Sequence, residues 1–151
     1  MDTLPRIVSE KKDISTQWFS LVKKAVFLPG STRQRHYYSI RQNDYVTIIA
    51  QTKKKEVVLI RQYRPAVEHY TLELPSGHID KNEKPEDAVI RELKEESSYL
   101  AIKPVLLGIL YPDTGRFENH LWAFYAANVQ LDKSPPKKEK SSGLPRLLLE
   151  K

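Results

Sequence analysis

The chain of 151 residues contains no cysteine. Disulfide bridges, thiolate zinc sites and a cysteine nucleophile are therefore excluded. Long apolar runs are missing too, since none approaches the ~20 residues that a membrane-spanning helix requires. The first residues, MDTLPRIVSEKKDIS, are too polar for a secretory signal. Together these absences predict a cytoplasmic protein with no membrane partner.

Charged residues are abundant, and they give the chain a formal net charge of +6 at pH 7. A strongly basic chain is one mark of a nucleic-acid-binding protein. Here much of the excess lies in short lysine runs at 23–24, 53–55 and 137–138, a pattern typical of solvated turns and strand edges. A basic surface also attracts polyanionic nucleotides. We therefore do not expect a nucleic-acid partner.

Strand-like segments dominate the chain, and one helix interrupts them. Strand character recurs at residues 17–29, 35–41, 44–51, 57–63, 70–74, 104–111 and 120–129. The helix is predicted from Pro85, which suits the first helical position, to about Ser97. Residues 1–13 read as a polar lead-in, 133–142 as a loop and 144–149 as a last short strand. The pattern predicts an α+β fold or a layered α/β/α arrangement around a mixed sheet.

The predicted helix places several acids on one stripe. At 100° per residue Glu92 and Glu96 lie one turn apart, with Glu95 beside them. Such carboxylates repel each other, and a bound divalent cation would relieve the conflict. Hard oxygen ligands favour Mg²⁺ or Mn²⁺. The alternative is a solvated acidic face on which Arg91 and Lys94 pair with the glutamates.

A wider pattern favours the metal site. Gly77, five residues, Glu83, seven residues and then Arg91-Glu-Leu-x-Glu-Glu resembles the signature of the Nudix hydrolase family. A chance match of this kind is on the order of one in a million. The resemblance covers residues 77–99, with one departure: Ser98 stands where the family has a glycine that stops the helix.

The resemblance implies an α/β/α sandwich with a mixed sheet and the hydrolysis of a nucleoside diphosphate linked to another group. We accordingly divide the chain into an N-terminal β segment, 1–50, and a Nudix domain, 51–151. The implied cofactor is Mg²⁺, with Mn²⁺ as a second option. The implied metal ligands are the main-chain carbonyl of Ser76 and the carboxylates of Glu92, Glu95 and Glu96. Gly77, Glu83 and Arg91 are implied to shape the loop and helix, the last two through a charge-assisted hydrogen bond.

Residues 77–99 are called here the box. The residues before the box narrow the resemblance to one branch of the family. Arg61-Gln-Tyr-Arg-Pro65 and Leu72-Glu-Leu-Pro-Ser-Gly77 resemble the ADP-ribose and ADP-sugar pyrophosphatase branch. That branch implies a nucleoside diphosphate sugar substrate, cut between its phosphates into a nucleoside monophosphate and a sugar phosphate. Arg64 would pair with the diphosphate, and Glu73 would support the metal site or its water network. A surface ion pair with Glu68 is the alternative for Arg64.

The N-terminal segment is implied to take part in substrate binding. In this branch an aromatic residue and an arginine of that segment clasp the base and phosphates, often across a homodimer. Trp18, Tyr37 or Tyr38, and Arg41 occupy suitable positions, although a tryptophan serves a core or interface equally well. Glu118, in the loop 112–119, is a candidate for reaching the metals or the sugar, or else an exposed loop acid.

The general base is left open by the sequence. Relatives carry a catalytic glutamate on a loop before the last strand, and Glu139 is the acid that this chain has there. The alternative is that a box glutamate, Glu95 or Glu96, acts as the base. Two rival functions also stay open: a Nudix hydrolase for a dinucleotide polyphosphate or an RNA cap, and a non-catalytic module that binds nucleotide or RNA.

Overall fold

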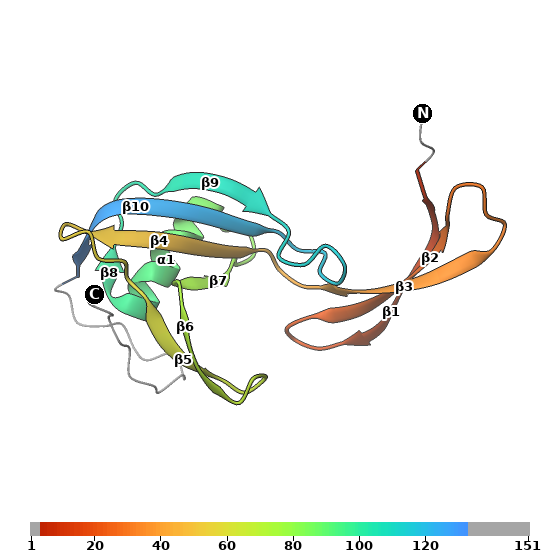
Figure 1. The fold of residues 1–151 in the computed structure, drawn as a ribbon, viewed down its shortest axis with the longest axis horizontal. Helices are drawn as coiled ribbons and strands as arrows, with labels where there is room; N and C mark the ends of the chain where they lie inside the picture. Colours follow the sequence, from red (N-terminus) through yellow and green to blue (C-terminus); the bar gives the residue numbers. More distant parts are fainter. Residues whose placement is uncertain (1–3, 133–151) are drawn as a thin grey trace. The chain divides into compact units, whose positions relative to one another are not determined.

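The computed structural model describes residues 4–132, and the chain divides into two compact units (Figure 1). The first, called here the N-terminal unit, comprises residues 1–43 and 111–120, and the second comprises 44–110 and 121–151. The segment 44–50, which the sequence-based division places in the N-terminal segment, thus groups with the second unit. The loop 111–120 groups with the first, far from it in sequence. The predicted loop 133–142 and strand 144–149 lie outside the described residues.

The N-terminal unit is built on a three-stranded antiparallel sheet (Figure 1). Its strands are β1 (Arg6–Ser15), β2 (Ser20–Phe27) and β3 (Gln34–Arg41), in that order. The prediction of a polar lead-in at 1–13 is therefore wrong for residues 6–13. Every side chain of β1 is exposed, so the strand is held by main-chain pairing with β2 and carries no apolar alternation for the sequence to reveal.

The second unit contains the predicted mixed sheet. Its strands are β4 (Tyr45–Thr52), β7 (Ser76–His78), β8 (Tyr99–Leu100), β9 (Val105–Leu110) and β10 (Leu121–Leu131). The order is β7-β4-β10-β8, and β9 also pairs with β10. β4 and β10 run parallel, while the other pairs are antiparallel. β7 and β8 span three and two residues, too few to show a periodic pattern in the sequence.

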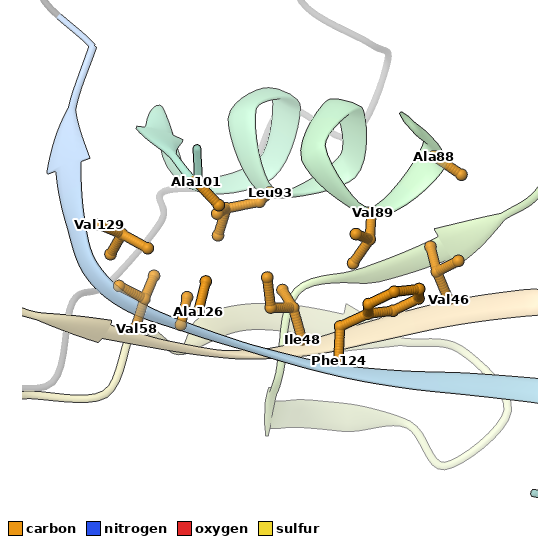
Figure 2. Packing of buried hydrophobic residues seen from close by; sticks show 11 residues of the cluster. Val46, Ile48, Val58, Ala88, Val89, Leu93, Ala101, Phe124, Ala126 and Val129 are labelled. Carbon is orange, nitrogen blue, oxygen red and sulfur yellow. The ribbon is translucent and has the colours of Figure 1, made fainter. Parts of the chain in front are cut away.

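One helix, α1 (Pro85–Ser97), covers one face of this sheet with the bounds that the sequence predicts. Figure 2 shows Val89 and Leu93 of α1 pointing onto Ile48 of β4 and Phe124 of β10, and all four side chains are buried. The apolar residues of the helix thus form its sheet-facing side, as an amphipathic pattern requires. Within residues 4–132 no helix has the length and apolar content that crossing a bilayer requires.

A separate two-stranded sheet carries two of the predicted site residues. β5 (Ile60–Arg64) pairs antiparallel with β6 (His69–Glu73), and Arg64 and Glu73 lie near their ends. The predicted strand at 57–63 begins later than expected. Val57 forms an isolated bridge with Gln51, and the Val58 N–H donates to the Ala50 carbonyl at 2.9 Å.

The end of α1 explains the departure at Ser98. Ser98 has φ 61° and ψ 14°, the left-handed conformation that favours glycine, and its N–H donates to the Lys94 carbonyl at 2.9 Å. The left-handed conformation therefore explains why the family has a glycine at this position. Ser98 adopts the same conformation at a cost in free energy.

Replacing Ser98 with glycine should stabilise the protein by about 1 kcal/mol, because the left-handed conformation no longer strains a side chain. Urea unfolding of Ser98→Gly against the parent chain measures the change. Ser97→Gly is the matched control: Ser97 lies inside the helix and its hydroxyl donates to the Leu93 carbonyl, so that variant should lose stability. Equal effects of the two substitutions would contradict the explanation.

Candidate active site

Arg91 is the centre of the box. Its Nε and Nη2 donate to the two carboxylate oxygens of Glu83 at 2.8 Å each, and Nη2 also donates to the His78 carbonyl at 3.0 Å. Its Nη1 donates to the Glu92 carboxylate and lies 3.7 Å from Glu95. The hydrogen bonds that Arg91 donates to Glu83, and further contacts with Glu92, raise the pKa of Arg91. The guanidinium thus joins the loop before α1 to the acids on the helix.

Glu92 is the buried acid of the site, with 8% of its surface exposed. A Cβ atom built on Gly77 would overlap the Glu92 carboxylate, so only a glycine lets the β7 backbone approach it this closely. The glycine of the signature is therefore needed for space, since no positive φ is recorded at Gly77. Glu92 is pressed between the backbone of β7 and the guanidinium of Arg91.

Glu96 is oriented by the same strand. The Ser76 N–H donates to the Glu96 carboxylate at 3.0 Å, and the Ser76 hydroxyl donates to Thr47 Oγ1 at 2.9 Å. Ser76 also pairs with Thr47 in the antiparallel register of β4 and β7. β7 thus contacts Glu92 through Gly77 and Glu96 through Ser76, which brings one strand against two successive turns of α1.

These residues fit a divalent cation by donor chemistry. Glu92, Glu95 and Glu96 offer hard carboxylate oxygens on one side of α1, beside the backbone of Ser76. Among residues 4–132, however, no three acidic or histidine side chains are already clustered as a cation site. Arg91 holds Glu92 in this arrangement, so the Glu92 carboxylate would have to exchange this contact for one with a cation.

Arg64 and Glu73 bind each other. Arg64 donates from Nε and Nη2 to the two oxygens of Glu73 at 2.8 and 2.5 Å, and the Thr71 hydroxyl also donates to this carboxylate. The hydrogen bonds raise the pKa of Arg64 and lower the pKa of Glu73. The alternative ion pair of Arg64 with Glu68 is absent from the contacts of the described chain, where the Glu68 N–H donates to the Arg64 carbonyl.

Two aromatic residues beside the box were not predicted from the sequence. Tyr45 of β4 and His78 of β7 face each other in register, with ring centroids 4.0 Å apart. Burial raises the pKa of Tyr45, and the charges of Arg64 and Glu92 also act on it, so the phenol lies in the fields of both groups. Burial lowers the pKa of His78. The alternation of β4 could have indicated that Tyr45 lies on the face opposite Val46, but nothing in the sequence pairs it with His78.

The N-terminal unit holds a second cluster, around Glu118. Its carboxylate accepts hydrogen bonds from Ser39 Oγ at 2.5 Å and Arg41 Nε at 2.6 Å, and forms an ion pair with Lys24. Burial would raise the pKa of Glu118, but the bonds from Lys24, Ser39 and Arg41 lower it to about 2. Arg41 also binds Glu10 through two bonds of 2.7 and 2.9 Å.

This cluster changes the roles predicted for two residues. Of the two readings of Glu118, the exposed loop acid is wrong, since 17% of its side-chain surface is exposed. Arg41, predicted to meet the substrate, is already bound by Glu118 and Glu10. Lys24 and Glu10 were missed because β1 was not recognised; the two residues are register partners in β1 and β2.

The predicted base-binding aromatics are exposed. Trp18 lies in the turn between β1 and β2 with 65% of its surface exposed, which excludes a core role within this chain. Tyr37 and Tyr38 are also exposed, and the Lys23 ammonium lies 5.8 Å from the centre of the Tyr38 ring. Glu139, the candidate loop acid, lies outside the described residues.

The fold and the box together define a class, and comparison with known proteins agrees. Residues 41–144, more than half of the chain, match the NUDIX domain family. The chain therefore belongs to the Nudix family. The crystal structure of an ADP compounds hydrolase has the same fold, with a TM-score of 0.81 over 96% of this chain and 77% of that chain, at 22% identity.

Two of the relatives have names that match the predicted branch. An ADP-ribose pyrophosphatase of Bacillus subtilis (strain 168) is 24% identical over 83% of this chain and 68% of that protein. An ADP-sugar pyrophosphatase of Mus musculus is 49% identical over 43 residues, 28% of this chain and 20% of that protein. A methanol dehydrogenase activator of Bacillus methanolicus is 31% identical over 76% of this chain and 58% of that protein. The chain thus spans only part of each relative. The resemblance to the pyrophosphatase branch, and with it the class of Nudix pyrophosphohydrolase, is confirmed.

Replacing Gly77 with alanine should weaken cation binding at least about tenfold, because the new methyl group displaces the Glu92 carboxylate. Isothermal titration of the purified protein with Mg²⁺ and Mn²⁺ measures the affinity. Gly108→Ala is the matched control, since a Cβ there has no atom within 4 Å and should leave binding unchanged. Unchanged binding by Gly77→Ala would show that Glu92 holds no cation.

The Glu118 cluster should make the N-terminal unit sensitive to acid. A folded-state pKa of about 2, below the ordinary 4.5, means that the stabilisation is complete above about pH 4.5 and is lost as pH falls towards 2. Its size is roughly 1–3 kcal/mol. Urea unfolding of Glu118→Gln and the parent chain at pH 6 and pH 3 measures it: the parent should lose more than half of its advantage at the lower pH. An advantage that is equal at both pH values would contradict this account.

Proposed function

We propose that this protein is a magnesium-dependent enzyme that hydrolyses the pyrophosphate bond of ADP-ribose or a related nucleoside diphosphate sugar. The products are a nucleoside monophosphate and a sugar phosphate. The observation that carries the proposal is the close fit of β7 against the acids of α1: Gly77 admits the Glu92 carboxylate, and the Ser76 N–H holds Glu96. The names of the relatives support the substrate class.

The cation would be held by Glu92, Glu95, Glu96 and the carbonyl of Ser76. When bound, Mg²⁺ neutralises charge that develops on the phosphate oxygens and lowers the pKa of a coordinated water. The protein's own contribution is to keep these ligands in place before substrate arrives. Arg91 does this for Glu92, and the backbone of β7 does it for Glu96.

Arg64 is the proposed phosphate-binding residue. Glu73 occupies its Nε and Nη2, so a phosphate oxygen would be met by Nη1, the remaining edge of the guanidinium. The charge of Glu96 is among those that act on Arg64, which supports a position beside the box. Glu73 then acts as a positioning residue, because it fixes the rotation of the guanidinium, in addition to its proposed support of the metal site or its water network.

The remaining roles are proposals of the same kind. Glu95, Glu96 and Glu139 are the candidates for the base that accepts the proton of the attacking water. Trp18 and Tyr38, both exposed, are candidates for stacking on the nucleobase, within a homodimer formed by the N-terminal unit. Glu118 holds Arg41 and the loop 111–120 in place for such contacts.

A panel of substrates tests the proposal directly. With Mg²⁺ present, ADP-ribose and ADP-sugars should release AMP, whereas a dinucleotide polyphosphate and a capped RNA should react far more slowly. Chromatography of the products identifies the bond that is cut. No turnover of any member, together with tight binding of RNA, would replace the enzyme with a binding module.

Substitution of single acids separates the roles. Glu96→Gln should lower kcat at least about a hundredfold, because a charged ligand is lost. Glu86→Gln, an exposed acid in the first turn of the same helix, is the matched control and should keep full activity. Glu139→Gln distinguishes the bases: a large loss assigns the proton transfer to Glu139, and an unchanged rate assigns it to the box. A fully active Glu96→Gln would overturn the metal assignment.

A further inference from the structure

Among the described residues, β9 is an edge strand that nothing protects from pairing with another strand. It pairs with β10 on one side, and within residues 4–132 no strand pairs with its other side. Five of its six residues are exposed, and all five are large and apolar, with Val105 at 60% and Leu107 at 59%. Natural sheets usually protect such an edge with charged side chains, a proline or a covering segment. β9 (VLLGIL) carries neither a charge nor a proline.

Both faces of β9 are apolar. Leu106 and Ile109 are register partners of Phe124 and Trp122, which pack on the α1 side of the sheet. Leu106 and Ile109 are nevertheless exposed. Val105 is paired with Tyr125, whose hydroxyl donates to Gln51 on the opposite side. α1 therefore does not extend over β9, and neither of its faces is buried in the described part of the chain.

The strand that pairs with β9, and the next strand of the sheet, are uncharged as well. None of the residues of β4, β9 and β10 is charged, although charged residues make up 29% of the chain. A polyanion such as RNA, an anionic membrane surface or a charged peptide would find no complementary group on these strands. The partner that fits is therefore itself uncharged and able to add a strand.

We propose that this partner is a second copy of the chain, which pairs its β9 antiparallel with this β9 about a two-fold axis. A copy brings the same uncharged edge, and two molecules with a net charge of +6 meet with least repulsion where neither carries charge. The pairing would satisfy the open main-chain groups and bury apolar side chains on both faces. A six-residue edge is small for an interface, so the association should depend on concentration in the micromolar range.

The absence of cysteine permits a direct test. Single cysteines placed in turn at positions 105–110 should form disulfide-linked dimers, most rapidly at the one or two neighbouring positions nearest the two-fold axis. Leu131→Cys is the control, being a leucine of similar exposure (57%) at the end of β10, and it should cross-link slowly. Equal, slow cross-linking at every position would overturn the proposal. Cysteines that stay inaccessible to a thiol reagent at concentrations where the chain is monomeric would also overturn it, since another part of the same chain would then cover the strand.

A charge on the edge provides the second test. Leu107→Lys should raise the dissociation constant of this contact at least about tenfold, whereas Leu131→Lys should leave it unchanged. Sedimentation velocity over a range of concentrations measures the dissociation constants of both variants. The equilibrium followed is that between dimer and monomer, or that between tetramer and dimer where the N-terminal unit also self-associates. Assembly that is equally strong in both variants, or a parent chain that shows no assembly at any concentration, would overturn the proposal.

Discussion

The ion pair between Arg91 and Glu92 is the interaction on which the site depends. Several carboxylates on one side of a helix repel one another, and a partly buried charge needs a partner. Arg91 meets both needs at once, because the same guanidinium also binds Glu83 and the His78 carbonyl. Arg91 thus does part of what a bound cation would do. A divalent ion entering the site would have to compete with Nη1 for Glu92, while the rest of the guanidinium keeps the loop and the helix together.

Hydrogen bonds between a glutamate carboxylate and an arginine also occur outside the box. Glu73 holds the guanidinium of Arg64, and Glu118 and Glu10 hold that of Arg41. Glu73 and Glu118 are residues that a reading of the sequence assigns to metal or substrate, because both are acids at positions of functional loops. In each case the carboxylate binds an arginine and fixes its rotation, and an arginine has the chemistry to bind phosphate.

What the sequence could predict follows from how local each feature is. The helix 85–97 and the box were found because proline, charge and spacing are local signals, and Gly77 was found by the same spacing. β1 was missed because its pairing with β2 leaves every side chain exposed, so no alternation marks it. The partners of Arg64 and Arg41 were missed because each pairing is set by a turn or by a loop far along the chain.

The basic charge of the chain illustrates the difference between composition and structure. A net charge of +6 suggests a polyanion-binding surface, yet seven of the 19 arginines and lysines in residues 4–132 form ion pairs with acids. Arg41, Arg64, Arg91 and Arg116 each bind carboxylates, and Lys94 pairs with Asp132 at 2.7 Å. The paired cations are not available to a continuous basic patch, and none of the residues of β4, β9 and β10 is charged. Under the proposed function, a few oriented guanidinium groups would therefore govern the binding of a nucleotide more than the overall charge does.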